Sequence, residues 1–187
     1  MNFIETYFMN DLTLCDDIIN HFKNLSPNKK GEGMVGFNNI HIDRTKKDSI
    51  EGELEWDETV GSVSYRYVQE LRKCTDQYIE KYPEANYYNK WGITEKVKIQ
   101  YYVPGGGYPA WHTERAERNN NRHLVFMTYL NDVEDGGETE FKLQNLKIKA
   151  EKGKTVIWPV DWTYTHRGII SPKQEKYIVT GWYDFID

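Results

Sequence analysis

The sequence predicts a mainly β fold with flanking helices. Two helical patterns precede residue 95, whereas four short segments rich in β-branched and aromatic residues follow it. Turns that contain glycine, PGGG, EDGG and EKG, separate these later segments. Because helices come first and strands afterwards, the order favours a helical layer supporting a β-sandwich or barrel over an alternating βαβ arrangement.

The two predicted helices cover residues 13–25 and 62–83. The first carries apolar side chains along one side, and Thr13 and Asp16 stand at the spacing of a capping box. In the second, apolar and aromatic residues recur near the helical period until Pro83 ends the pattern. Both segments are therefore expected to pack one face against the rest of the chain.

The predicted strands share short length and β-branched or aromatic composition, and they cover residues 96–102, 122–130, 153–158 and 176–183. Residues 39–56 are polar and weakly patterned, so we expect them to form a long loop between the helical part and the β part.

Length and composition limit the class of protein. A chain of 187 residues with 39% apolar residues is long enough for one globular domain, which we expect to span residues 1–187. The net charge of -5 argues against broad binding to nucleic acid, and no segment approaches the roughly 20 apolar residues of a membrane span. We expect a soluble, cytoplasmic protein in which Cys15 and Cys74 are buried thiols without a disulfide.

A histidine and a glutamate in the stretch GGGYPAWHTERAE suggest a metal site. His112 and Glu114 flank one threonine, so they project to the same side if this segment is extended, as Pro109 favours for Tyr108. With a second histidine, such a pair would occupy one face of an octahedral metal and leave open positions, as in non-heme Fe(II) sites. The alternative is two polar residues on an exposed edge.

The remaining histidines are the candidates for the third ligand. His21 belongs to the first predicted helix and is most simply a surface or partly packed residue, whereas His123 begins a predicted strand and serves as a fallback. His166 follows the strand 153–158, and Lys176 stands ten residues later inside another strand. Lys176 is either a solvent-exposed cation or a buried ammonium that pairs with an anionic ligand.

Four blocks of the second half, in this order and spacing, resemble the 2-oxoglutarate- and Fe(II)-dependent oxygenases, specifically the prolyl 4-hydroxylase-like group. These blocks are IQYYVPGGGYPAWHTE, VFMTYLNDVEDGGETEF, KGKTVIWPV and HRGIISPKQEKYIVTGWY, within residues 97–184. The resemblance implies a double-stranded β-helix (jelly-roll) core in residues 95–187, with residues 1–94 as helical support and a lid at 39–56.

The resemblance also assigns roles to residues. It implies that His112, Glu114 and His166 are the iron ligands and catalytic residues, and that Lys176 binds the distal carboxylate of 2-oxoglutarate with help from the Tyr102 hydroxyl. Tyr101 competes for the tyrosine role, because this chain has one more residue between Tyr102 and His112 than the common pattern. Fe(II), 2-oxoglutarate and O2 are the implied cofactor and cosubstrates, and ascorbate is a further candidate.

The acidic ligand departs from the family, which usually has His-x-Asp. The extra methylene of Glu114 moves the carboxylate by about 1.5 Å, which a strand shift or another rotamer could absorb. A literal His-x-Asp occurs at His41 and Asp43, with His112 downstream and Arg122 ten residues later. We reject this second set because a polar segment follows it instead of a strand and no glycine-rich approach precedes it.

The resemblance implies hydroxylation of a C–H bond with release of succinate and CO2. Lys176 and GGETEF favour the prolyl hydroxylase subgroup, hence a prolyl residue in a peptide or protein. A free amino acid or other small metabolite is the alternative substrate, and a non-catalytic jelly-roll metal-binding module is the alternative function. Several aromatic residues could line a peptide groove, although core or rim positions are more common for them: Tyr108, Trp111, Trp158, Trp162 and Trp182.

Overall fold

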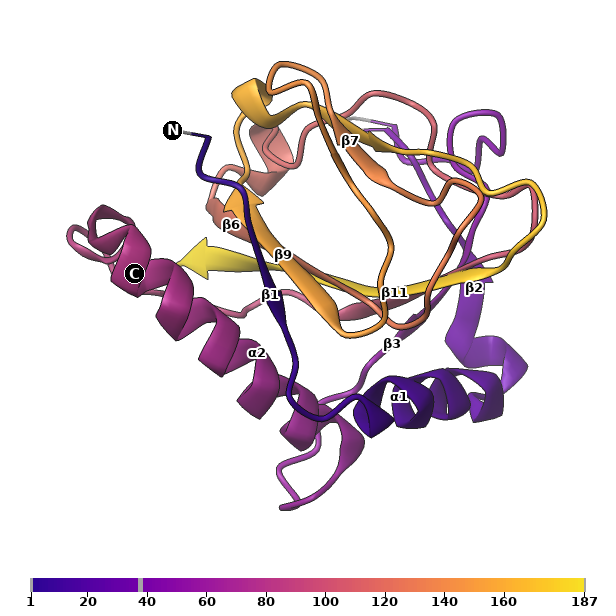
Figure 1. The fold of residues 1–187 in the computed structure, drawn as a ribbon, viewed down its shortest axis with the longest axis horizontal. Coiled ribbons are helices and arrows are strands. Elements are labelled where there is room, and N and C mark those ends of the chain that lie inside the picture. Colours follow the sequence, from indigo (N-terminus) through magenta and orange to yellow (C-terminus); the bar gives the residue numbers. More distant parts are fainter. Residues whose placement is uncertain (1, 37–38, 187) are drawn as a thin grey trace.

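Two antiparallel β-sheets face each other, and two helices pack against the outer face of the larger sheet (Figure 1). The computed structural model describes residues 2–36 and 39–186, and residues 1, 37, 38 and 187 lie outside the described part. The helices are α1 (Thr13–Asn24), α2 (Val63–Lys81) and the short 3-10 helices η1 (Pro27–Lys29), η2 (Pro83–Asn86), η3 (Glu117–Asn119) and η4 (Trp162–Tyr164).

The strands of the larger sheet lie in the order β1-β9-β6-β11-β5-β3-β2, and β4 pairs with the end of β11. The smaller sheet has the order β10-β7-β8. Their bounds are β1 (Glu5–Phe8), β2 (Lys30–Glu32), β3 (Ile50–Glu53), β4 (Trp91–Gly92), β5 (Lys98–Tyr102), β6 (Arg122–Tyr129), β7 (Thr139–Phe141), β8 (Leu146–Ile148), β9 (Lys154–Pro159), β10 (His166–Gly168) and β11 (Lys176–Phe185). The four predicted strands are confirmed as β5, β6, β9 and β11, and the mainly β fold class is confirmed with them.

Strand β11 separates the two cores of the molecule, because successive side chains of a strand point to opposite faces. Tyr177 and Val179 face α1 and α2, where they join the core that those helices bury. Ile178 and Trp182 face the smaller sheet and belong to the second core. The same alternation places Lys176 on the side of the second core, between the sheets.

Both predicted helices are present, but the start of α1 differs from the prediction. Ser62 caps α2 by accepting a hydrogen bond from the Tyr65 amide at 3.2 Å. The capping box predicted at Thr13 and Asp16 is wrong, since Thr13 is already helical and its amide and hydroxyl bind Asp11 Oδ1 instead. A capping residue must precede the helix with non-helical backbone, which spacing alone does not reveal.

The segment 39–56 is more ordered than a long loop. Its residues Ile50–Glu53 form β3, which pairs with β5, and Asp48 forms a backbone bridge with Gly107. The sequence did not reveal β3 because its four residues, IEGE, include two glutamates and a glycine, so it lacks the apolar alternation of a half-buried strand.

The described residues confirm the expectation for the two cysteines. Cys15 and Cys74 are buried free thiols, and burial raises the pKa of the Cys74 thiol to about 11, so it stays protonated at neutral pH.

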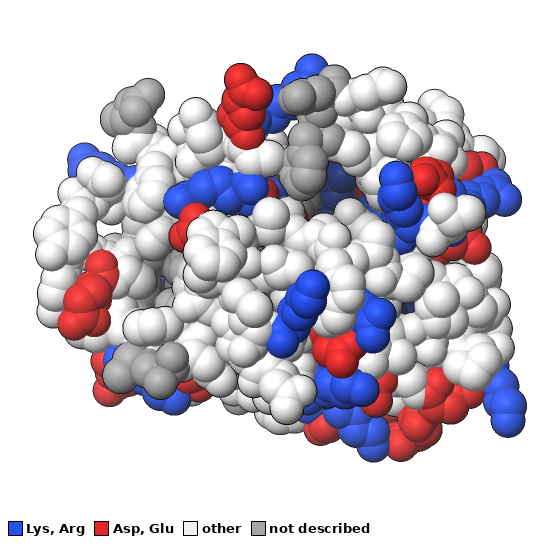
Figure 2. Space-filling model, turned by 90° about the horizontal axis from the view of Figure 1, so that it is seen from above, with Lys and Arg blue, Asp and Glu red and all other residues white. Residues whose placement is uncertain are grey.

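No helix in the described ranges is both long and apolar enough to cross a membrane. Acidic and basic side chains are interspersed on the face in Figure 2, and basic ones lie beside the recess near its centre.

Candidate metal centre and cosubstrate pocket

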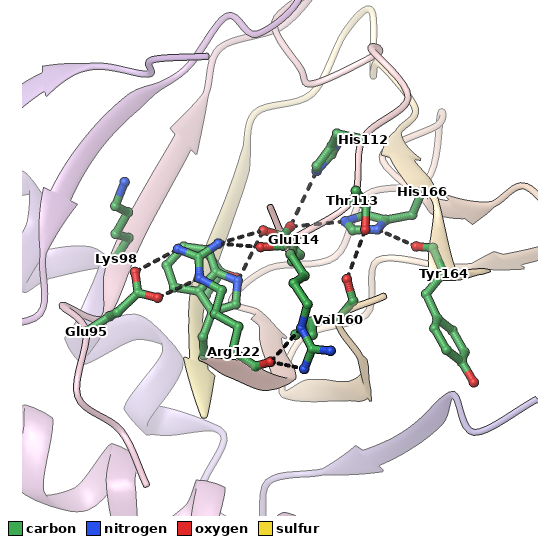
Figure 3. A network of polar contacts seen from close by, with 12 residues as sticks. Glu95, Lys98, His112, Thr113, Glu114, Arg122, Val160, Tyr164 and His166 are labelled. Atoms are coloured by element: carbon green, nitrogen blue, oxygen red, sulfur yellow. Dashed lines mark hydrogen bonds and ion pairs between the residues drawn. The ribbon is translucent and has the colours of Figure 1, made fainter. Parts of the chain in front are cut away.

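Backbone pairing brings His112 and His166 together. The His112 amide donates to the His166 carbonyl at 3.0 Å, and the His166 amide donates to the His112 carbonyl at 2.9 Å. Between the histidine and the glutamate, the Thr113 hydroxyl turns away and donates to the Val160 carbonyl at 2.9 Å. His112 and Glu114 therefore point to one side, as extended backbone predicts, and their side chains meet His166 in Figure 3.

The chemistry of the three side chains fits a divalent metal. In each imidazole Nδ1 lies 2.9 Å from a backbone carbonyl, that of Ala110 for His112 and that of Tyr164 for His166. A carbonyl only accepts, so Nδ1 carries the proton and Nε2 of the neutral ring presents a lone pair. Both Nε2 atoms face Glu114 Oε1, at 3.5 and 3.4 Å, and ligand atoms of all three residues lie within 4.8 Å of one another. Three converging lone pairs call for a cation.

The pKa shifts of His112 and Glu114 also favour metal binding. Burial and the neighbouring His166 lower the pKa of His112, which keeps its imidazole neutral at pH 7. Burial opposes ionisation of Glu114, but positive charge at the two neighbouring histidines would hold its pKa well below the ordinary value, and a metal cation would take over this role when both rings are neutral. With both imidazoles in the tautomer described above, the centre would offer two nitrogen lone pairs and one carboxylate oxygen.

A buried lysine lines the same cavity as the three candidate metal ligands. Lys176 begins β11 with 5% of its surface exposed, and its Nζ donates to the Gly137 carbonyl at 3.1 Å. Burial lowers the pKa of Lys176 to about 8, against the opposing effect of Glu138. Gly137 can present this carbonyl because its φ of +80° suits glycine, and a Cβ there would meet Val133 at 2.7 Å. Lys176 is therefore a buried ammonium rather than a surface cation.

Tyr102 lies beside this lysine, and Tyr101 does not. The Lys176 Nζ is 4.9 Å from the centre of the Tyr102 ring, whereas Tyr101 stacks on Tyr177 on the helical side of the sheet. The Tyr102 hydroxyl donates to Gln100 Oε1 at 2.7 Å, and burial raises its pKa well above the ordinary value. Because the Tyr102 hydroxyl already donates to Gln100, it can donate to a cosubstrate only if its hydrogen bond to Gln100 is broken.

Comparisons with known proteins agree with this arrangement of a candidate metal centre beside a buried lysine. Residues 97–184 match the family model described as the 2OG-Fe(II) oxygenase superfamily. The match covers just under half of the chain and supports a 2OG-Fe(II) oxygenase of the prolyl 4-hydroxylase-like group.

One curated relative is "Probable prolyl 4-hydroxylase 9" of Arabidopsis thaliana, at 30% identity over 37% of this chain and 32% of the relative. The match thus spans about a third of that protein's length. Among solved structures, the viral collagen prolyl hydroxylase of Paramecium bursaria Chlorella virus-1 aligns with a TM-score of 0.72 at 20% identity, covering 99% of this chain and 97% of that chain.

Two further solved structures share the fold. A Pseudomonas putida prolyl-4-hydroxylase aligns with a TM-score of 0.72 at 13% identity, covering 100% of this chain and 95% of that one. A Trichoplax adhaerens prolyl hydroxylase, in complex with a hypoxia-inducible-factor degradation-domain peptide, aligns with a TM-score of 0.74 at 18% identity, covering 98% and 84%. These likenesses confirm the jelly-roll fold class.

His41 and His123 lie apart from the cluster of His112, Glu114 and His166. His41 is exposed and contacts the Asn39 carbonyl, and Asp43 accepts from Thr45. His123 contacts the Ala85 carbonyl at 2.8 Å and packs on Trp91 at the helical side. The second His-x-Asp set therefore forms no metal cluster among the described residues.

A cavity of about 500 Å³ joins the candidate metal centre to Lys176. This volume falls within the range of small-molecule pockets and exceeds what a five-carbon diacid needs. Part of its wall comes from Met34–Gly36 and from residues of the segment 39–56, including Lys47. Lys47 is buried and paired with Glu51, so this part of the proposed lid is anchored to the pocket.

The five aromatic candidates for a peptide groove divide between core and pocket. Trp158 and Trp182 are buried in the second core, and the Tyr108 ring stacks on His112 with centroids 3.8 Å apart. Trp111 lines the cavity and is 37% exposed, whereas Trp162 is 70% exposed. Trp111 is thus the aromatic best placed to meet a substrate at the cavity mouth.

Sequence reasoning missed the residues that support Glu114. In the sequence, Arg122 was considered as part of the second His-x-Asp set, which we rejected. In the structure, its Nη1 lies 3.4 Å from Glu114 Oε2. Trp182 was treated as a groove residue, yet its Nε1 donates to the same oxygen at 3.1 Å. Strand alternation could have indicated Trp182, because residues 176 and 182 lie on one face of β11.

Proposed function

We propose that this chain is an Fe(II)- and 2-oxoglutarate-dependent oxygenase that hydroxylates a prolyl residue in a peptide or protein. The observation that carries the proposal is the convergence of His112, Glu114 and His166 within 4.8 Å, with lone pairs facing one another. Two imidazoles and one carboxylate on one face are the ligand set of non-heme Fe(II) oxygenases.

Fe(II) with 2-oxoglutarate and O2 supplies the oxidising chemistry, in which one oxygen atom enters a substrate C–H bond while 2-oxoglutarate becomes succinate and CO2. His112, Glu114 and His166 would hold the metal and leave its other face to the cosubstrates. Lys176 would pair with the distal carboxylate of 2-oxoglutarate through a charge-assisted hydrogen bond. Ascorbate belongs to the proposal as an accessory reductant.

The pocket walls bind and orient the cosubstrate. Lys176 is buried between the sheets, so an anion that reaches it leaves water and gains a strong ionic contact. The Tyr102 ring fixes one side of the lysine chain, and the Gly137 carbonyl fixes the direction of its ammonium. These contacts restrict the anion to one orientation relative to Glu114.

Two features support a prolyl substrate. The solved relatives named above are described as prolyl hydroxylases, one with collagen in its name and one bound to a degradation-domain peptide. At the cavity, Trp111 offers a partly exposed indole face, against which the apolar ring of a proline can pack. The Arg167 guanidinium lies 4.4 Å from the centre of the Trp111 ring and holds it in place.

The proposal is tested by substrate-dependent succinate release. Purified protein with Fe(II), 2-oxoglutarate, ascorbate and air is incubated with an array of proline-containing peptides, and peptide mass is recorded beside succinate. We expect both signals from a subset of peptides and neither from His166→Ala. Succinate release with free amino acids alone would move the activity to small metabolites.

A metal-binding module without turnover is separated by an anaerobic titration. Fe(II) and 2-oxoglutarate together should give a weak visible charge-transfer band in the oxygenase. A protein that binds metal but gives no such band and no succinate would be a binding module instead.

A further inference from the structure

The two carboxylate oxygens of Glu114 have different surroundings. Oε1 faces the Nε2 atoms of His112 and His166, at 3.5 and 3.4 Å. Oε2 accepts a hydrogen bond from Trp182 Nε1 at 3.1 Å. It also lies 3.4 Å from Arg122 Nη1, and Figure 3 shows Arg122 on the side of Glu114 away from the two histidines. One oxygen is thus directed to the candidate metal centre and the other is engaged by the protein.

From this asymmetry we propose that Arg122 and Trp182 are positioning residues that hold Glu114 Oε2 away from the metal, so that Glu114 binds through Oε1 alone. The inference rests on the proposed function. It concerns how this chain uses a glutamate at a position where its family usually has aspartate.

Arg122 is itself held from several sides. Its Nη2 donates to Glu95 Oε2 at 2.7 Å and its Nε donates to Glu95 Oε1 at 2.5 Å, a bidentate pair. Its guanidinium lies 3.5 Å from the centre of the Trp182 ring, and its Nη1 also donates to the Glu114 carbonyl at 2.9 Å. With 9% of its side chain exposed, Arg122 has little freedom to follow a moving carboxylate.

Binding through one oxygen matters for the number of open positions. A facial set of three ligands on an octahedral metal leaves room for the chelating cosubstrate and for O2. A carboxylate that binds through both oxygens would take one of those positions. Glutamate has one more rotatable bond than aspartate, so it has more freedom to turn its second oxygen inward unless that oxygen is held.

A purely structural role is the competing explanation. Arg122 connects the Glu95 segment to the start of β6, and an ion pair of that kind could serve stability alone. In that case its removal would lower stability without changing the metal centre. The positioning role and the structural role therefore predict different results for metal affinity and for the spectrum of the bound metal.

The test compares Arg122→Met and Trp182→Phe with wild type, using Mn(II) binding followed by electron paramagnetic resonance. Trp182→Phe keeps an aromatic ring in the core and removes the N–H donor, so it is the variant that best preserves the fold. Removing a hydrogen-bond partner of a metal ligand typically weakens metal affinity about 10- to 100-fold. We expect losses of this size, and a changed anaerobic absorption band of the Fe(II)·2-oxoglutarate complex.

Two further variants sharpen the comparison. Arg66→Met removes another partly buried arginine that pairs with two carboxylates, Asp11 and Asp17, and should leave Mn(II) affinity unchanged. Glu114→Asp shortens the ligand so that its outer oxygen no longer reaches Arg122. Arg122→Met should therefore weaken Mn(II) binding much less in the Glu114→Asp background than in wild type.

The outcomes are distinguishable. If wild type binds Mn(II) and gives the Fe(II)·2-oxoglutarate band while folded Arg122→Met and Trp182→Phe match it in both, the positioning role is wrong and the proposed function stands. If wild type binds neither metal, the proposed function fails and this inference fails with it.

Discussion

Replacing Lys176 with methionine removes a buried ammonium and keeps the length of the side chain. Burial lowers the pKa of Lys176 from its ordinary value of 10.5 to about 8. At roughly 1.4 kcal/mol per pKa unit, this corresponds to about 3 kcal/mol lost from the free energy of unfolding at pH 7. The Gly137 carbonyl would lose its donor, at a cost of about 1 kcal/mol. Lys176→Met should therefore stabilise the cosubstrate-free protein by about 2 kcal/mol.

The same substitution should weaken 2-oxoglutarate binding. A hydrogen bond to a charged partner contributes roughly 1.5–3 kcal/mol, which corresponds to about a 10- to 150-fold loss of affinity. Stability and cosubstrate affinity then change in opposite directions. Urea unfolding measures the first quantity, and anaerobic titration of the Fe(II) protein with 2-oxoglutarate measures the second. Lys149→Met, which removes an exposed ammonium paired with Glu134, is the control and should leave 2-oxoglutarate affinity unchanged.

The pH dependence follows from the same lysine. The folded protein loses this proton near pH 8 and the unfolded chain near 10.5, so the stability penalty is complete below pH 8 and disappears as pH rises from 8 to 10.5. Cosubstrate affinity of wild type should fall above pH 8, whereas that of Lys176→Met should not respond there. A Lys176→Met protein that is less stable than wild type and binds 2-oxoglutarate equally well would refute the reasoning.

Three further outcomes can be checked. His166→Ala should abolish Mn(II) binding, because two ligands remain and one lone pair is lost, and isothermal titration would detect any binding that persists. Tyr102→Phe should weaken 2-oxoglutarate binding less than tenfold, since its hydroxyl already donates to Gln100, and a larger loss would assign that hydroxyl to the cosubstrate. Trypsin should cut after the exposed Arg44 and Lys46 and spare the buried Lys47. If the segment 39–56 is a lid, 2-oxoglutarate plus substrate should protect these sites from trypsin. Unchanged cleavage would show that the segment is not a lid.

Much of the fold could be predicted because its signals are local. Strands β5, β6, β9 and β11 have β-branched and aromatic composition, and α2 has helical periodicity together with the stop at Pro83. Strand β1 was missed because Glu5–Phe8 pairs only along β9 and alternates weakly in burial. Strand β3 was missed because its two glutamates and its glycine are more typical of a loop than of a strand.

The candidate site, too, could be predicted from the sequence only in part. The spacing of His112, Glu114, His166 and Lys176 was readable through family resemblance, and the structure brings these four side chains to one cavity. The partnership of Arg122 with Glu114 was not readable, because it depends on how the unpatterned residues between them fold back. Contacts of that kind are set by tertiary packing rather than by any sequence period.

Strand β11 is the longest of the described strands, and it serves both stability and chemistry because it carries Lys176 and Trp182 of the candidate site. Tyr177, Val179 and Tyr183 are buried against α1 and α2, so the helices fix the strand from behind. Lys176 and Trp182 project from the opposite face into the region between the sheets. Because neighbouring side chains alternate, any shift of β11 that loosened the helical core would also move the lysine and the indole. The helical layer therefore contributes to the geometry of the site although none of α1 or α2 lines the cavity.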